Sequence, residues 1–235
     1  MWKTIADELE RAIQERRLKP GDKLPSEQQL VRKYYVNRHV VRRALASLAD
    51  GGLIHSHQGR GSYVARPTLP MQITRRTRFS ETVRRAGAAH INRTLKLEQT
   101  PAPADIAREF GVRQSTPLVC LERVAIVNDQ PIGMSAHYFL ASRVPGFIEL
   151  YAGFGSITST LNALGIPDYV RAHTRIHSRL PMPDEALMLG MPQHVPLIIT
   201  RAINTDLAGA ILEYGEARLA ADRVELVLQP PAEPA

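Results

Sequence analysis

Apolar residues recur with helical spacing near the start of the chain. Ile5, Leu9 and Ile13 are four residues apart, so they form one apolar stripe on a helix whose other face is charged. Pro20-Gly21 then stops this helix and turns the chain. The pattern predicts a first amphipathic helix that packs one face against a small core.

Two further helices are indicated by their capping residues. Ser26 has Gln29 three residues later, which is the pattern of a capping box and predicts the start of a second helix. Asn37 is a good N-cap for a third helix. The apolar stripe that this third helix is expected to bury consists of Val41, Ala44, Leu45 and Leu48.

The other side chains of the third helix carry hydrogen-bond donors. The side chains that point away from the apolar stripe are those of Arg38, His39, Arg42 and Arg43. Of these, Arg38 and Arg42 lie one turn apart near the N-terminal end of the helix. A recognition helix presents donors in its N-terminal half to a major groove. A guanidinium suits guanine edges and phosphates, so this face of the helix is expected to contact DNA.

Residues 53–64 predict a short β-hairpin after the third helix. Its tip comprises Gln58, Gly59, Arg60 and Gly61, where the glycines allow a close approach to DNA and Arg60 could reach the minor groove or its phosphates. Three helices followed by such a hairpin predict a winged helix-turn-helix. The alternative is a small helical domain with a solvated basic face and a surface hairpin.

From residue 91 onward the pattern changes to alternating apolar and polar positions, which is typical of strands. Helical segments lie between predicted hairpins, and this order predicts an α+β domain on a mostly antiparallel sheet. The predicted strands are residues 94–97, 116–127, 132–140, 168–180, 196–204, 210–219 and 223–228. The predicted helices are residues 103–110, 157–164 and 183–189.

The formal net charge of +7 over 235 residues is unevenly distributed. Residues 1–66 hold 13 Lys and Arg against 7 Asp and Glu, residues 67–90 hold 5 against 1, and residues 91–235 hold 12 against 15. A basic segment attracts phosphates, whereas the acidic remainder is not expected to bind nucleic acid. We expect a DNA-binding domain, a linker with a short helix, an effector-binding and dimerisation domain, and a flexible tail, over residues 1–66, 67–90, 91–229 and 230–235.

Several classes of chemistry lack support in the sequence. The single cysteine, Cys120, lies in an apolar run and is expected to be a buried strand residue in a reducing cytoplasm. The pairs His55/His57 and His173/His177 have no cysteine or carboxylate at ligand spacing, so neither a metal nor another cofactor is expected. No apolar stretch approaches the length of a membrane span, and no pairing of a nucleophile with a base is visible.

Three motifs of the N-terminal segment match a known pattern. They are Leu24-Pro25-Ser26-Glu27, the run from Val36 to Arg42, and the wing sequence Gly59-Arg60-Gly61-Ser62-Tyr63-Val64. Together they resemble the DNA-binding domain of GntR-type transcription regulators. Asn37 replaces the usual serine of that pattern, and Val40 replaces a threonine, which removes one hydroxyl contact and leaves the preferred operator sequence open.

The resemblance implies which residues contact double-stranded DNA. Those in the helices come from the first turn of helix one, the start of helix two and the exposed face of helix three, and the rest come from the tip of the wing. The basic run of residues 74–78 could also touch phosphates or could face solvent. The residues implied are Lys3, Ser26, Glu27, Arg38, His39, Val40, Arg42, Arg43, Gln58, Gly59, Arg60 and Gly61.

The second half carries the fragments Thr77-Arg78-Phe79-Ser80, Ser156-Ile157-Thr158, residues 165–171 with Thr174, and Glu213-Tyr214-Gly215 leading to Asp222-Arg223. With the order of predicted elements, they resemble the UTRA effector-binding domain of the HutC branch of GntR regulators, which shares its fold with chorismate lyase. Within that branch the fragments are similar to regulators of phosphonate uptake and degradation. The resemblance covers residues 1–228 and implies a homodimer that binds a small anionic effector.

An anionic effector requires guanidinium, hydroxyl and backbone N–H groups that converge on one point. Arg123 lies in the middle of a predicted strand, where a charge needs a partner. Ala125 replaces a second arginine of the relatives, and Ser135 stands where many of them carry a glutamate. The expected effector site is Arg123, Ser135, His137, Ser156, Thr158, Tyr169, Arg171, Arg175 and Glu213.

Each of these side chains also has a purely structural interpretation. Arg123 could pair with Glu213, Ser156 could act only as an N-cap, and His137 could be a structural histidine. The later strand arginines, Arg171 and Arg175, could simply face solvent.

The sequence therefore leads to one leading hypothesis. It is a cytoplasmic, homodimeric regulator, a repressor that leaves an inverted-repeat operator when a phosphonate or a phosphorylated metabolite binds. Within this class the alternative effectors are a phosphosugar and a small carboxylate such as urocanate. Two other classes remain: an enzyme of chorismate-lyase type with a DNA-binding appendage, and an architectural DNA-binding protein whose second domain serves only dimerisation.

Overall fold

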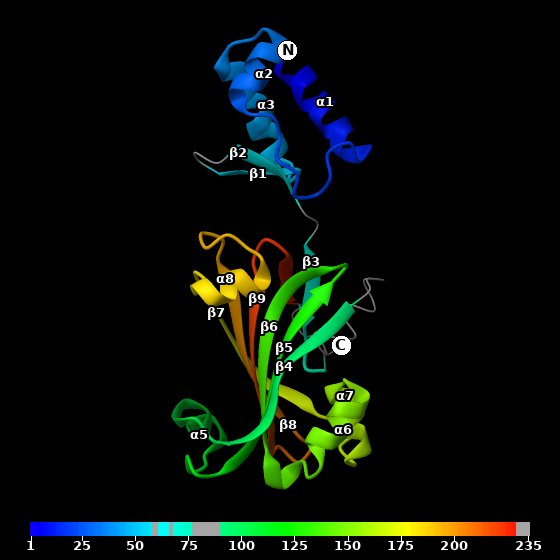
Figure 1. The fold of residues 1–235 in the computed structure, drawn as a ribbon, viewed down its shortest axis with the longest axis vertical. Helices are drawn as coiled ribbons and strands as arrows, with labels where there is room; N and C mark the ends of the chain where they lie inside the picture. Colours follow the sequence, from blue (N-terminus) through cyan, green and yellow to red (C-terminus); the bar gives the residue numbers. More distant parts are fainter. Residues whose placement is uncertain (58–60, 66–67, 77–89, 229–235) are drawn as a thin grey trace, which may run out of the picture. The chain divides into compact units, whose positions relative to one another are not determined.

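In the computed structural model the chain forms two compact units, Met1–Pro67 and Thr68–Ala235 (Figure 1). The structure describes residues 1–57, 61–65, 68–76 and 90–228. The predicted helix over residues 77–87, the wing residues Gln58, Gly59 and Arg60, and the predicted tail lie outside the described residues.

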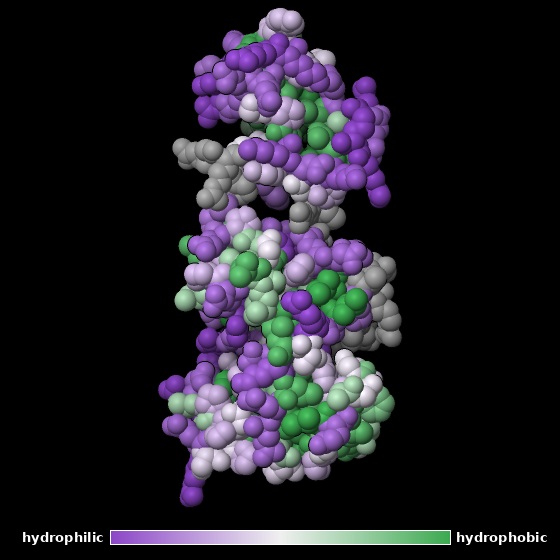
Figure 2. Space-filling view, in the orientation of Figure 1, coloured by the Kyte–Doolittle hydropathy of each residue, from purple (hydrophilic) through white to green (hydrophobic). Residues whose placement is uncertain are grey.

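The N-terminal unit consists of three helices and a two-stranded antiparallel sheet. Its buried core draws on every one of these elements, and the exposed surface of the unit in Figure 2 is mainly hydrophilic. All four residues of the stripe predicted for the third helix are buried. The elements are α1 (Trp2–Gln14), α2 (Glu27–Tyr34), α3 (Arg38–Asp50), β1 (Ile54–His57) and β2 (Gly61–Val64).

The predicted helix starts are confirmed. The Ser26 hydroxyl accepts a hydrogen bond from the Gln29 N–H, and the Gln29 side chain accepts one from the Ser26 N–H, which completes the capping box of α2. The Asn37 side chain accepts from the Val40 N–H at the start of α3. Tyr35 closes α2 in the left-handed conformation and allows the chain to turn into α3.

The C-terminal unit is built on a six-stranded, wholly antiparallel sheet, which confirms the predicted α+β class. Its strand order is β4-β5-β6-β9-β8-β7, so the hairpins β5–β6 and β8–β9 meet along β6 and β9 at the centre. The strands are β4 (His90–Pro101), β5 (Pro117–Val127), β6 (Gln130–Leu140), β7 (Val170–Arg179), β8 (Leu197–Thr205) and β9 (Ile211–Ala220).

Helices cover both faces of this sheet. One face packs against α6 (Phe147–Phe154) and α7 (Ile157–Ala163), and the other packs against α5 (Ala104–Phe110) and α8 (Pro183–Leu189) (Figure 1). A 3-10 turn, η1 (Ala141–Arg143), leads from β6 toward α6. Helix α6 was not predicted, because it begins at Gly146 without a side-chain cap and its sequence is apolar on most sides.

The remaining strands change the linker prediction and show where the predicted last strand pairs. Residues 69–73, which the sequence placed in a linker, form β3 (Leu69–Ile73) and pack within the C-terminal unit. The predicted last strand, β10 (Val224–Leu228), pairs with β3 in parallel and therefore forms a second, two-stranded sheet. This small sheet packs on the same face of the large sheet as α6 and α7 (Figure 1).

Candidate functional site

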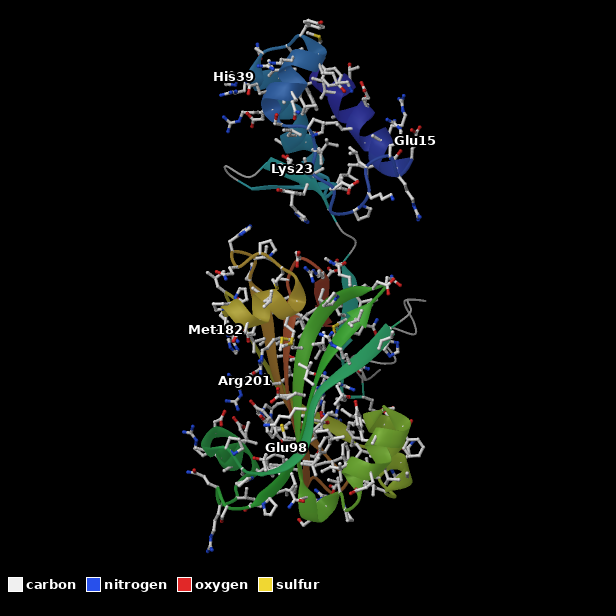
Figure 3. The ribbon with its side chains drawn as sticks, viewed as in Figure 1. Glu15, Lys23, His39, Glu98, Met182 and Arg201 are labelled. Carbon is white, nitrogen blue, oxygen red and sulfur yellow. The ribbon has the colours of Figure 1, made fainter. Side chains whose placement is uncertain are left out.

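The exposed face of α3 carries three of the predicted DNA contacts. Arg38, His39 and Arg42 are exposed, and the two arginine side chains are each 69% accessible. Glu27 lies between them, with its carboxylate oxygens 3.8 Å from Nε of Arg38 and 3.9 Å from Nε of Arg42. Figure 3 shows His39 projecting outward from the helices. The start of α2 and the start of α3 thus present one mixed charged surface.

Three other predicted contacts have partners inside the unit. The guanidinium of Arg43 lies 4.8 Å from the centroid of the Trp2 ring, and Nζ of Lys3 lies 5.7 Å from the same centroid. Val40 packs partly against the core. The Arg43 contact therefore joins α3 to α1, whereas the Lys3 contact stays within α1, and contact of all three side chains with DNA stays a prediction.

The wing has a basic neighbour that the sequence analysis did not single out. Lys23, which is labelled in Figure 3, forms a β-bridge with Tyr63 of β2. Its Nζ lies 5.8 Å from the centroid of the Tyr63 ring. The segment before α2 therefore runs beside β2. Gly61 begins β2 with a φ of +99°, which a side chain would strain. The Lys-Leu-Pro-Ser sequence carried no signal of this pairing, because the bridge joins segments far apart in the chain.

The C-terminal unit contains a cavity of about 240 Å³ on the α6/α7 face of the large sheet. The strand registers place its lining residues in rows across four or five strands. Arg123, Ser135, Ala217 and Thr200 form one such row, because each is paired with the next. The cavity is closed by β3 and the segment after it, by the start of α7, and by Tyr169.

A chain of hydrogen bonds crosses the floor of the cavity. Nδ1 of His137 lies 2.5 Å from Oε1 of Glu213, and Nε2 of His137 lies 3.0 Å from the Ser135 hydroxyl. The Asn204 amide donates to the other oxygen of Glu213 at 2.6 Å, and Nε of Arg123 donates to the Ser135 hydroxyl at 3.3 Å. Five polar side chains from four strands are therefore connected, and Glu213 pairs with His137 instead of the Arg123 partner considered from the sequence.

The surroundings determine the protonation states of His137 and Glu213 in this hydrogen-bond network. Burial lowers the pKa of His137, and the Arg123 cation lowers it further. Together these effects outweigh the hydrogen bond and negative charge of Glu213, which raise that pKa. Burial by itself raises the pKa of Glu213, but its hydrogen bonds with His137 and Asn204 and the nearby Arg123 cation bring that pKa below its usual value. The pair is therefore a neutral imidazole beside an ionised carboxylate.

Three buried polar atoms that line the same cavity have no hydrogen-bond partner among the described residues. They are Nε of Arg171, Oγ1 of Thr174 and Oδ1 of Asn92. A buried polar atom without a partner costs about 1–3 kcal/mol. The Arg171 guanidinium is also costly, since burial lowers its pKa. These atoms favour a polar occupant that supplies both an acceptor for Arg171 and a donor for Asn92.

Each of the two units matches a known protein family. Residues 2–64 match the bacterial regulatory proteins of the gntR family, and residues 85–225 match the UTRA domain. The chain belongs to the UTRA-containing GntR regulators. This family consists of transcriptional regulators and not of enzymes, so the enzyme alternative from the sequence is set aside.

Relatives and a solved structure match most of the length of this chain. The HTH-type transcriptional regulator RB1450 of Rhizobium meliloti is 36% identical over 97% of this chain and 94% of its own length. The HTH-type transcriptional repressor PhnF of Mycolicibacterium smegmatis is 25% identical over 94% of this chain and 88% of its own. The crystal structure of PhnF from Mycobacterium smegmatis shares the fold, with a TM-score of 0.68, 24% identity, and coverage of 97% and 99% of the two chains.

Eight of the nine predicted effector residues line the UTRA cavity. The exception is Arg175, which is exposed and pairs with Glu109 of α5. The prediction for Arg175 is therefore wrong. The pairing of β7 with β8 shifts register between Arg171 and His173, so the two arginines four residues apart no longer share a face. Thr174 takes the place on the cavity side that the sequence had assigned to Arg175.

The remaining predicted residues line the cavity in different ways. Ser156 uses its hydroxyl to accept the Ser159 N–H, as the N-cap interpretation expected, while Thr158 in the first turn of α7 also borders the cavity. Asn92, Thr174 and Asn204 also line the cavity but were not among the predicted effector residues, because ordinary strand residues of this kind show no signal before the register is known.

Neither a metal site nor a membrane span is found among the residues that the structure describes. Within the part of the chain that it describes, no three His, Cys, Asp or Glu side chains are grouped so that they could hold a metal ion. In the same residues, no helix is long and apolar enough to cross a membrane.

Proposed function

We propose that this UTRA-containing GntR regulator is a homodimeric repressor that binds an inverted-repeat operator and releases it when a small anion occupies the cavity. The favoured effector is a phosphonate or a phosphorylated metabolite. The DNA contacts are assigned to the exposed face of α3, to Glu27 and to the wing. The effector contacts are assigned to Arg123, Ser135, His137, Ser156, Thr158, Tyr169, Arg171 and Glu213.

The charge of the cavity lining is the observation that best supports an anionic effector. Arg123 and Arg171 both line the cavity, and neither guanidinium has a carboxylate within ion-pair distance among the described residues. The two carboxylates that also line it are already engaged, Glu213 with His137 and Glu216 with Arg201 and Arg218. The cavity therefore has excess positive charge, and an oxyanion with several acceptor oxygens would satisfy it.

The repressor assignment is supported by relatives and by the physics of dimeric recognition. The relative PhnF of Mycolicibacterium smegmatis is named a repressor. A helix-turn-helix dimer binds only when its two recognition helices match the spacing of the half-sites. An effector that favours dimers with another spacing shifts the population away from DNA. Nearly complete release requires a preference of roughly 5 kcal/mol for that state.

The melting temperature of the full-length dimer with and without effectors tests this proposal. The panel comprises inorganic phosphate, methylphosphonate, 2-aminoethylphosphonate, glucosamine 6-phosphate and urocanate. A ligand that binds only the folded state raises the melting temperature, and the rise grows with the logarithm of the ligand concentration above its Kd. We expect a rise with at least one phosphonate or phosphate ester, together with release of operator DNA in an anisotropy assay.

Arg171→Gln and Arg175→Gln form a matched pair of variants on one strand. Removing a buried guanidinium that lacks a carboxylate partner should leave the free protein as stable as before or more so, while the ligand-induced rise disappears. Arg175→Gln should keep the full rise, because that side chain lies outside the cavity. A response to urocanate only, or a rise that persists in Arg171→Gln, would contradict the anion assignment.

A further inference from the structure

The side chains of Ser135, His137 and Glu213 lie in a line across the cavity floor. The hydroxyl of Ser135 is 3.0 Å from Nε2 of His137, whose Nδ1 is 2.5 Å from the Glu213 carboxylate. Glu213 is held from its other side by the Asn204 amide. This is the order of nucleophile, base and orienting carboxylate that activates a serine in unrelated folds.

The proton positions follow from the partners. An ionised Glu213 can only accept, so Nδ1 of His137 carries the proton and donates it to the carboxylate. Nε2 then has a free lone pair and accepts the hydrogen bond from the Ser135 hydroxyl. Nε of Arg123 donates to the same hydroxyl oxygen. The imidazole is therefore ready to take the serine proton, and a cation lies beside the oxygen that would become negative.

We infer that Ser135 is a covalent acylation site for small activated esters that carry an anionic end. The Ser135 oxygen forms a bond to the carbonyl carbon, and its proton moves to Nε2 of His137. The bond from that carbon to the leaving alkoxide or phenolate then breaks, and the leaving group takes the proton from His137. The products are an O-acylated Ser135 and the free alcohol, so no oxidant or further reactant is needed.

The cavity accounts for the class of ester. Arg171, Thr174 and Asn92 present buried polar atoms without partners to the same space, and an anionic end would satisfy the arginine. The reaction is a single covalent capture in a regulator, and no turnover is implied. This acylation goes beyond the reversible binding proposed above, because a bound effector can cause release of the operator whether or not Ser135 is acylated.

The test uses the full-length protein with two probes, mono-4-nitrophenyl succinate and 4-nitrophenyl acetate. Intact mass spectrometry measures the stoichiometry of acylation, peptide mapping locates the bond, and absorbance follows the released nitrophenolate. We expect one acyl group per chain on Ser135, formed faster from the anionic succinate ester. His137→Gln should slow this acylation by about 100-fold or more, the usual contribution of a general base.

Three further variants make the outcome decisive. Ser135→Ala should abolish the adduct, and Ser135→Cys should restore acylation because a thiol can replace the hydroxyl. Ser178→Ala changes an exposed serine of β7 and should react like the original protein. Melting curves confirm that each variant is folded. Peptide mapping of the acyl group on the original protein locates the reactive residue without any variant.

The outcomes that would overturn the inference are distinct from those that test effector binding. Absence of an adduct on Ser135, an adduct only on lysines or other serines, or a rate unchanged in His137→Gln would each reject the acylation site. None of these results affects the phosphonate-induced rise in melting temperature. Conversely, a protein that ignores phosphonates can still acylate Ser135.

Discussion

Nδ1 of His137 lies 2.5 Å from Oε1 of Glu213, although the two residues are 76 positions apart in the chain. They meet because β6 and β9 pair at the centre of the large sheet, with His137 opposite Gly215. The side chains are 15% and 4% exposed, so this polar pair is almost removed from water. It ties together the hairpins β5–β6 and β8–β9 and lies on the floor of the cavity.

This pair gives the protein a defined response to acid. The pKa of His137 is lowered from 6.5 by burial and by the Arg123 cation, so below about pH 6.5 the unfolded chain binds a proton that the folded chain refuses. The free energy of unfolding should therefore fall as the pH decreases from about 7 to about 5. The contribution of one such proton is at most about 1.4 kcal/mol per pH unit.

Urea unfolding at several pH values measures this slope, and His137→Gln provides the comparison. The variant should lose part of the slope between about pH 7 and pH 5. Glu213 has a lowered pKa, so the stability that it contributes is present above its ordinary value of 4.5 and is lost at lower pH. Parallel slopes for the variant and the original protein would show that His137 is not the group responsible.

Gly133 should not tolerate a side chain. It lies where β6 approaches β9, and an added Cβ would be 2.7 Å from a methyl carbon of Leu219 and 3.0 Å from the backbone oxygen of Arg218. Gly133→Ala should lower the free energy of unfolding by about 1–3 kcal/mol, because the backbone cannot move away without disturbing the sheet.

Gly153→Ala is the matched control for that substitution. Gly153 lies in α6 with nothing within 4 Å of its added Cβ. Alanine at this position should leave the stability unchanged or raise it by up to about 1 kcal/mol, because alanine loses less backbone freedom in a helix. Denaturant unfolding of both variants gives the comparison, and an equal loss in the two would contradict the packing argument.

Glu27 should tune how selectively the protein binds DNA. Its carboxylate lies near Arg38 and Arg42, so it repels phosphates and restrains both guanidiniums. Glu27→Gln should raise the affinity for non-operator duplexes and reduce the ratio of operator to non-operator binding. Arg38→Ala should lower operator affinity by about 1–3 kcal/mol.

Anisotropy titrations with an operator selected from random duplexes, at one fixed salt concentration, test both substitutions. Arg113→Ala removes an exposed arginine of the C-terminal unit and serves as the charge control. Equal losses in Arg38→Ala and Arg113→Ala would mean that net charge alone controls binding. An unchanged binding ratio in Glu27→Gln would remove Glu27 from the recognition surface.

The sequence by itself determined the local elements of this protein. Ser26 with Gln29 and the amide of Asn37 specify where α2 and α3 begin, because a cap is satisfied by atoms three residues away. The alternation of β5 and β6 likewise placed Arg123, Ser135 and His137 on strands before their partners were known. Such features depend on neighbours in the chain, and the motifs of the N-terminal unit are of this kind.

The tertiary structure decided everything that depends on register and on distant pairing. A one-residue irregularity in β7 keeps Arg171 in the cavity and removes Arg175 from it. The parallel pairing of β3 with β10 turns a supposed linker into part of the C-terminal unit. The line from Ser135 through His137 to Glu213 exists only because β6 and β9 are adjacent. Long-range strand pairs leave no local signal, since a shift of one residue exchanges the two faces of a strand.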